Sequence, residues 1–239
     1  MLQINDGSIM ANDYFKFKQF IIRQDLCAMK VGTDGTLLGA WARGGHRILD
    51  IGTGTGILAL MMAQRYDDAL VDAIDIDDGA YIQAKHNVEE SPFFERIKVL
   101  NKSLQTFAES KLNETYDSIV CNPPYFRHSL KAPDARRSIA RHADTLSYRD
   151  LTNNSFQLLS ENGELSLVIP FDYRQNMEEE AILSGFFPSR ICAVKTTRNK
   201  PPKRYLLAFK KRPTTVQQEE LILDSEEYKT MMKDFYLYL

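Results

Sequence analysis

The sequence predicts an α/β fold, in which a mostly parallel sheet is covered by helices on both faces. Short apolar runs rich in strand-forming residues recur at 47–51, 69–75, 97–100, 118–121, 164–169, 190–195 and 205–210. Helical patterns separate these runs, and such alternation is typical of parallel strands joined by helices. A glycine-rich turn directly after the first run marks the usual strand-to-helix crossover of such a sheet.

The helical patterns between the runs are short and strongly apolar. Ile57, Leu58, Leu60 and Met61 predict a buried helix after the first strand. Ser147-Tyr-Arg-Asp150 has the spacing of a helix N-cap, and we expect Ser147 to act only as that cap.

Length and composition favour one domain over residues 1–239. A chain of 239 residues with 44% hydrophobic content can bury a full core, and no repeat or Gly/Ser linker divides it. We expect a core at 47–212 and a C-terminal extension at 213–239. In that extension, helical spacing predicts a helix from Tyr228, Met231, Met232 and Phe235.

Charge and cysteine usage narrow the class of protein. The net charge of −2 means that affinity for nucleic acid must come from local patches. Cys27, Cys121 and Cys192 are far apart and form no metal-binding spacing, so we expect a reduced, cytoplasmic protein without structural zinc. No signal peptide or membrane-spanning run is evident, and we expect no membrane association.

The segment DIGTGTG at 50–56 follows the first predicted strand and opens a helix. Ile57 stands where a dinucleotide-binding motif needs its third glycine, which argues against a nicotinamide cofactor. An acidic residue, Asp50, followed by Gly52, Gly54 and Gly56 resembles the first motif of class I methyltransferases. In those enzymes the helix N-terminus receives the methionine carboxylate of S-adenosylmethionine. An ordinary tight turn is the alternative.

Asp75 closes the second predicted strand about twenty residues after the glycines, where a carboxylate can bind two ribose hydroxyls. Alternatively, Asp75 caps the next helix. In the class I fold an acidic residue usually follows the third strand beside the adenine, whereas Ser103 occupies that place here. We therefore include Ile76, Ser103 and Leu104 among the cofactor-binding candidates, and the adenine contact stays open. Asn122, at the end of the fourth predicted strand, is also a cofactor-binding candidate.

Asn122-Pro-Pro-Tyr125 ends the fourth predicted strand and suits methylation of a planar amino group. The Asn122 side-chain oxygen and the Pro123 carbonyl can accept both amino protons as the nitrogen gains positive charge. Pro123 and Pro124 restrict the backbone that carries these acceptors. Tyr125 offers a ring for stacking, commonly worth about 1 to 3 kcal/mol per base. A stiff turn without chemistry is the alternative.

This combination resembles the amino-methyltransferase branch of class I methyltransferases. Residues 15–20, 24–26, 29–35, 38–41, 122–126, 140–142 and 202–206 further resemble the bacterial tRNA(Val) adenine N6-methyltransferases over nearly the whole chain. The resemblance implies a Rossmann-like seven-stranded sheet, S-adenosylmethionine as cofactor, and the adenine 3′ of the anticodon, position 37, as target. It also implies that the segment 1–46 packs on the cofactor site, with Lys30, Thr33 and Asp34 beside the cofactor. Thr33 and Asp34 are equally suited to cap a helix over 36–41.

Two basic segments are candidates for RNA binding, because phosphate contacts position RNA. The run 190–212 contains nine Lys and Arg residues and no Asp or Glu, and a second cluster follows the Asn122 motif directly. A solvated charged face is the alternative for each. The RNA-binding candidates are Phe126, which we expect to stack beside the target base, Arg127, Lys131, Arg136, Arg137, Arg141, Arg198, Lys200, Lys203 and Arg204.

Other activities remain as alternatives. A protein glutamine N5-methyltransferase uses the same motif, but the 49 residues before Asp50 leave little room for a recognition domain. An amino-methyltransferase of rRNA or DNA is a further alternative. Guanine-modifying relatives usually have phenylalanine in place of Tyr125, and DNA adenine enzymes usually carry an added recognition domain. A non-catalytic RNA-binding module is the fourth possibility. We expect tRNA as the substrate and no obligate protein partner.

Overall fold

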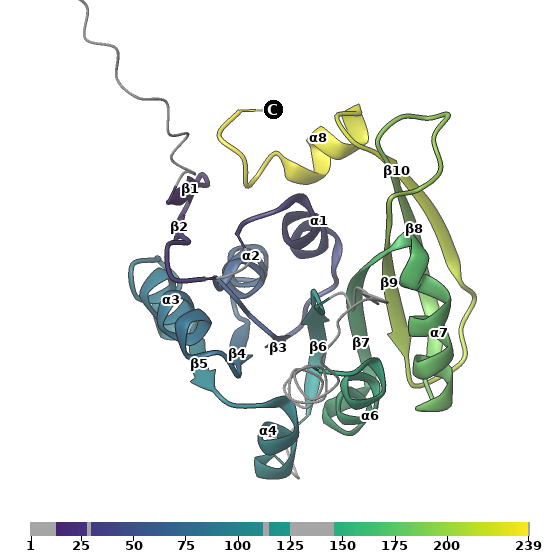
Figure 1. The fold of residues 1–239 in the computed structure, drawn as a ribbon, viewed down its shortest axis with the longest axis horizontal. Coiled ribbons are helices and arrows are strands. Elements are labelled where there is room, and N and C mark those ends of the chain that lie inside the picture. Colours follow the sequence, from purple (N-terminus) through teal and green to yellow (C-terminus); the bar gives the residue numbers. More distant parts are fainter. Residues whose placement is uncertain (1–12, 28–29, 112–114, 125–145, 239) are drawn as a thin grey trace, which may run out of the picture.

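The computed structural model describes residues 13–27, 30–111, 115–124 and 146–238. It confirms the α/β prediction, with a large central sheet between two layers of helices (Figure 1). All seven predicted runs are strands, with ends that differ by a few residues. They are β3 (Arg47–Ile51), β4 (Leu70–Asp75), β5 (Ile97–Asn101), β6 (Tyr116–Cys121), β7 (Leu159–Pro170), β8 (Phe187–Lys195) and β9 (Arg204–Lys210).

Within the described residues the sheet contains eight strands, so the predicted number of seven was wrong. The strand order is β10-β8-β9-β7-β6-β3-β4-β5, and β10 (Gln217–Ile222) lies in the C-terminal extension, parallel to β8. Its first four residues are polar and exposed. An edge strand needs no continuous apolar run, and β10 therefore lacked the pattern that revealed the others.

The direction of the strands divides the sheet into two halves. The pairs among β5, β4, β3, β6 and β7 are parallel, whereas β9 runs antiparallel to both β7 and β8. The chain proceeds from β3 outward to β4 and β5 and returns on the other side of β3 as β6. The boundary between β3 and β6 is thus a topological switch point, where open α/β sheets bind ligands at the carboxyl edge.

Helices cover both faces of the sheet (Figure 1). One face carries α1 (Thr33–Trp41), α2 (Ile57–Arg65), α3 (Asp78–Glu89) and α8 (Glu226–Met232), and the other carries α4 (Leu104–Ser110), α6 (Tyr148–Leu158) and α7 (Arg174–Leu183). The short 3₁₀ helices are η1 (Phe94–Arg96) and η2 (Phe171–Tyr173). The predicted cap at Ser147 is confirmed, because Ser147 accepts a hydrogen bond from Asp150 N at 3.0 Å, but Ser147 also lines the cavity of the candidate active site and so is not only a cap. The cap alternative for Thr33 and Asp34 was wrong, because Gly32 is the N-cap of α1 and no side chain caps that helix. The helix predicted in the extension forms as α8 and ends before Phe235.

Alternation along the strands builds a separate apolar core on each face. Ile48 packs with α1 and α2 on one side, and its neighbour Leu49 packs with α4 and α6 on the other. Successive side chains of a strand point to opposite faces, so a strand buried on both faces is apolar throughout. None of the helices in the described ranges is long and apolar enough to cross a membrane.

The N-terminal residues form a small hairpin of β1 (Tyr14–Lys16) and β2 (Ile21–Arg23). The hairpin is tied to α3, because Arg23 N donates to Asn87 Oδ1 at 2.9 Å. It also meets the C-terminal end, where Phe17 forms a bridge with Tyr236. Residues 24–27 then continue past α3, and Leu26 N donates to Gln83 Oε1 at 2.8 Å.

Candidate active site

A cavity of about 820 Å³ lies at the carboxyl ends of β3, β4, β5 and β6. This is the position that the topological switch point predicts. Seven of the predicted cofactor-binding residues line it, together with Pro124 of the catalytic motif. These residues are Gly52, Gly54, Asp75, Ile76, Ser103, Leu104 and Asn122.

The glycine loop has a backbone that suits only glycine. Gly52, Gly54 and Gly56 have φ values of +67°, +58° and +84°, which other residues rarely adopt. A Cβ added to Gly52 would meet nothing within 4 Å, so the loop backbone stands open to the cavity. Gly56 is the N-cap of α2 and packs against Ala84 of α3, rather than lining the cavity in the part of the chain that is described.

Asp50 holds the glycine loop in place through hydrogen bonds. It is completely buried and accepts hydrogen bonds from Thr53 Oγ1 at 2.6 Å and from Ala59 N at 3.1 Å. Burial raises the pKa of this carboxyl to about 7, because the charged form loses its hydration. Asp50 therefore shapes the turn, and among the described residues it is not part of the cavity wall.

Asp75 links the glycine loop to the next turn. Its Oδ2 accepts from Gly54 N at 2.9 Å and its Oδ1 accepts from Asp77 N at 3.0 Å. The alternative role of helix cap is wrong for Asp75, because Asp77 is the N-cap of α3 and accepts from Ala80 N at 2.7 Å. The pKa of the Asp75 carboxyl is raised above its usual value, mainly because burial disfavours the charged form.

The ends of β4 and β5 contribute both apolar and polar side chains to the cavity wall. Ile76 is 57% exposed although it is apolar, and it presents an apolar surface to the cavity. Leu104 is buried below, and Ser103 caps α4 by accepting from Thr106 N at 3.1 Å. No carboxylate occupies the position of Ser103, but Lys102 and Gln105 line the cavity next to it.

The Asn122 motif follows β6 directly. Asn122 and Pro124 line the cavity, whereas Pro123 is buried. Burial and the charges of Asp50 and Asp75 hold the pKa of the neighbouring Cys121 thiol well above its usual range, so Cys121 contributes a neutral wall. Tyr125 and the candidates at 126–141 lie outside the described residues.

Lys30, Thr33 and Asp34 were expected beside the cofactor, but among the described residues they do not line the cavity. Thr33 and Asp34 lie in the first turn of α1, whose N-cap is Gly32. Asp34 forms an ion pair with Arg204 at the start of β9. Asp34, a predicted cofactor-binding residue, and Arg204, a predicted RNA-binding residue, therefore form an ion pair with each other.

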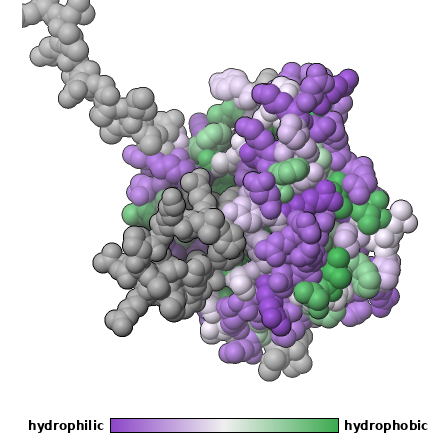
Figure 2. All heavy atoms as spheres, turned by 45° about the vertical axis from the view of Figure 1, so that its right-hand side comes forward, coloured by the Kyte–Doolittle hydropathy of each residue, from purple (hydrophilic) through white to green (hydrophobic). Residues whose placement is uncertain are grey.

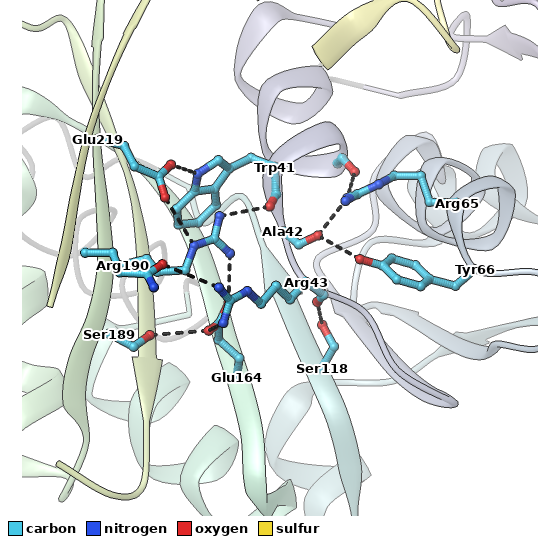
Figure 3. A network of polar contacts seen from close by, with 12 residues as sticks. Trp41, Ala42, Arg43, Arg65, Tyr66, Ser118, Glu164, Ser189, Arg190 and Glu219 are labelled. Carbon is cyan, nitrogen blue, oxygen red and sulfur yellow. Dashed lines mark hydrogen bonds and ion pairs between the residues drawn. The ribbon is translucent and has the colours of Figure 1, made fainter. Parts of the chain in front are cut away.

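The basic run 190–212 also separates into two groups. Arg190 is 6% exposed; its guanidinium lies 3.7 Å from the centre of the Trp41 ring and 3.2 Å from Glu164 (Figure 3). Lys195 pairs with Glu220 at 2.7 Å. Arg198, Lys200 and Lys203 are exposed. The face that carries α7 and β10 is largely hydrophilic, with hydrophobic side chains in small separate groups (Figure 2).

Sequence reasoning missed several cavity residues because they come from elements distant in the chain. Cys27 follows the hairpin, and the N-terminus of α6 brings Leu146, Ser147 and Asp150. The capping pattern had revealed Ser147 and Asp150, but not that the helix begins at the cavity. The remaining lining residues are Ile51, Ile74, Asp77, Ala80, Lys102, Gln105 and Cys121.

The sheet order, the open glycine loop, Asp75 and the Asn-Pro-Pro turn together define a methyltransferase of the Rossmann-like class. The chain belongs to the methyltransferase small domain family, whose model matches residues 36–198, and with its bacterial relatives to the tRNA1(Val) adenine-N6-methyltransferases.

Those relatives match the chain almost from end to end. The tRNA1(Val) (adenine(37)-N6)-methyltransferase of Parabacteroides distasonis is 48% identical over 237 residues, which cover 95% of this chain and 99% of the relative. The protein of the same description from Trichodesmium erythraeum is 44% identical, with 95% and 99% covered.

Solved structures share the fold. A protein from Agrobacterium tumefaciens, described as a predicted O-methyltransferase, superposes with a TM-score of 0.63 at 17% identity, covering 84% of this chain and 96% of that chain. M. jannaschii TYW2 in complex with AdoMet gives 0.54 at 12% identity, covering 82% and 83%. These likenesses confirm the fold class.

Proposed function

We propose that this chain transfers the methyl group of S-adenosylmethionine to N6 of adenine 37 in tRNA1(Val). The observation that carries the proposal is the Asn-Pro-Pro turn at the end of β6, which meets the glycine loop and Asp75 at one cavity. Relatives that are 44% to 48% identical over nearly the full chain are described by this same activity.

The cavity residues fit S-adenosylmethionine. The open backbone at Gly52 suits the methionine moiety, and the Asp75 carboxylate at the end of β4 suits the ribose hydroxyls. Ile76 and Leu104 offer apolar contact for the adenine, beside Ser103. When bound, S-adenosylmethionine supplies an electrophilic methyl group on its sulfonium.

The Asn122 turn would activate the target nitrogen. The lone pair of an adenine amino group is delocalised into the ring, so the nitrogen becomes nucleophilic as it pyramidalises and gains positive charge. The Asn122 side-chain oxygen and the Pro123 carbonyl accept its two N–H groups and stabilise that charge. The two prolines keep these acceptors in place, and Tyr125 stacks on the extruded base.

RNA would approach across the carboxyl edge of the sheet. Arg198, Lys200 and Lys203 are exposed and suited to phosphate contacts, as are the sequence candidates Arg127, Lys131, Arg136, Arg137 and Arg141. Phe126 is proposed to stack beside the target base. Arg204 is removed from this set because it is paired with Asp34. We place the enzyme in the cytoplasm, acting on tRNA without an obligate protein partner.

The decisive experiment supplies labelled S-adenosylmethionine and the purified chain to total tRNA, rRNA, DNA and protein extract in parallel. We expect label in tRNA, N6-methyladenosine on nucleoside analysis, and position 37 of tRNA1(Val) on mapping. A tRNA1(Val) transcript with guanosine at position 37 is the matched control and should stay unlabelled. Methylguanosine, methylglutamine or labelled DNA as the main product would contradict the proposal.

A further inference from the structure

An exposed aromatic ring lies at the carboxyl edge of β7, next to the strand that carries the Asn122 turn. Phe171 opens η2 directly after β7 and is 49% exposed. Cys121 of β6 pairs in register with Leu167 of β7, so Phe171 comes three residues beyond the level of Asn122. From the strand spacing and the rise per residue, the two backbones are on the order of 10 Å apart. That distance is suitable for a nucleotide adjacent to the one held at Asn122.

The ring of Phe171 is held in place by contacts with β9 and the residue before that strand. Phe171 N donates to Lys203 O at 3.1 Å, and the ring stacks on Tyr205 with 6.1 Å between centroids and 28° between planes. Tyr205 is almost buried, and the Arg174 guanidinium lies 4.3 Å from the centre of its ring. A ring fixed in this way loses little conformational entropy when a ligand stacks on it.

The charges around Phe171 favour a polyanion. The loop 196–203 carries Arg198, Lys200 and Lys203, all exposed, and contains no Asp or Glu. Asp172 follows Phe171 in the chain, and Arg198 interacts electrostatically with Glu227. We therefore expect Lys200 and Lys203 to contribute most of the attraction for a polyanion. A fixed aromatic ring beside exposed cations is the arrangement with which proteins bind single-stranded nucleic acid.

We propose that Phe171 is a stacking platform for an unpaired base next to the target adenine, with Lys200 and Lys203 on the phosphates of that segment. The inference rests on the proposed tRNA function and adds a positioning residue to it. An anticodon-loop base can unstack from its neighbours and lie on Phe171 while the target adenine enters the cavity.

The test separates stacking from charge. The affinity for tRNA1(Val) is measured at several salt concentrations, together with single-turnover methylation and S-adenosylmethionine affinity. Phe171→Ala should weaken RNA binding about tenfold without changing the salt slope, a loss within the range for one stacked base. Phe171→Tyr should remain close to wild type. Lys200→Ala/Lys203→Ala should reduce the salt slope by about 1 to 2.

Phe94→Ala is the matched control. Phe94 is 55% exposed in η1, which precedes β5 at the opposite edge of the sheet, and its loss should leave RNA binding unchanged. Phe171→Leu keeps apolar volume without an aromatic face, so it should bind RNA as weakly as a folded Phe171→Ala. It also replaces that variant if Phe171→Ala does not fold.

Each other outcome overturns the inference. Wild-type affinity in Phe171→Ala or Phe171→Leu would show that the ring does not stack on RNA, and an equal loss in Phe94→Ala would show a general effect. If the wild-type enzyme forms N6-methyladenosine and the Phe171 variants bind tRNA1(Val) as tightly as wild type, only the stacking role of Phe171 is rejected. Wild-type enzyme that fails to methylate tRNA would reject the proposed function as well.

Discussion

The two halves of the sheet present different chemistry at the same edge. In the half formed by β3, β4, β5 and β6, all strands are parallel and deliver glycines, carboxylates and the Asn122 amide to one cavity. Beyond β7, in the half formed by β9, β8 and β10, the antiparallel strand β9 is joined to β8 by a hairpin loop at that edge, and this loop carries exposed cations.

A basic residue within a strand and one in a loop have different roles, although both belong to the same run of the sequence. Arg190 lies within β8, and its guanidinium contacts buried Trp41 and Glu164 and the more exposed Glu219 (Figure 3). Lys200 lies in the loop only ten residues later and is exposed. Both belong to one basic run, yet the first is a structural residue and the second is available to a ligand.

The largest effect should come from Arg190→Ala. Glu164 is 3% exposed, and without Arg190 it would keep only the more distant Arg43 at 3.7 Å as an ion-pair partner in the described structure. Stranding one charge of a buried pair typically costs about 3 to 5 kcal/mol of unfolding free energy. Denaturant titration should find this loss, whereas Lys200→Ala should stay within about 0.5 kcal/mol of wild type.

The double variant Arg190→Met/Glu164→Leu refines this prediction. It removes both charges, so it should recover much of the stability that Arg190→Ala loses. Equal stability of Arg190→Ala and Lys200→Ala would mean that the two parts of the run are alike.

The raised pKa of Asp50 predicts that the stability of the protein depends on pH. Its pKa is raised to about 7 in the folded protein, so folding favours the protonated carboxyl. The contribution of Asp50 to stability is therefore present below about pH 4 and is lost as pH rises towards 7. Relative to Asp50→Asn, wild type should lose up to about 4 kcal/mol across that interval.

Urea titrations of both proteins at several pH values measure this difference. Asp68→Asn, at an exposed turn before β4, controls for the change in net charge. Parallel pH profiles for wild type and Asp50→Asn would contradict the role of burial.

Asn122→Ala should lower single-turnover methylation by about a hundredfold or more, the scale for losing one preorganised acceptor in the transition state. S-adenosylmethionine affinity should be retained, because Asn122 acts on the target nitrogen. Asn101→Ala, at the end of β5 outside the cavity lining, is the matched control. A wild-type rate in Asn122→Ala would remove this residue from the chemistry.

Asp75→Ala should have the smallest of these effects, a weakening of S-adenosylmethionine binding by at least tenfold, about 1.4 kcal/mol. Calorimetry measures the affinity, and Asp78→Ala tests a neighbouring carboxylate that does not line the cavity in the described part of the chain. Asp75→Asn keeps the side-chain size and should still bind more weakly than wild type. Unchanged affinity in both Asp75 variants would exclude the ribose contact.

Local sequence patterns were sufficient to predict seven strands of the central sheet, the fold class and the edge at which the cavity lies. Local patterns suffice for these, because buried parallel strands are apolar and their carboxyl ends meet at one edge. Gly52, Asp75 and Asn122 each directly follow or close such a strand, so their spacing placed them together at one cavity.

Contacts between residues from distant elements could not be predicted in this way and became known from the three-dimensional packing. β10 lacked an apolar run because it lies at the edge of the sheet. Its pairing with β8 depends on how the C-terminal extension, residues 213–239, packs against the sheet. Asp34 and Arg204 are far apart in sequence but form an ion pair, and the N-terminus of α6 brings Asp150 to the cavity. Such contacts depend on how helices and strands pack in three dimensions, which periodicity and charge counts along the chain do not encode.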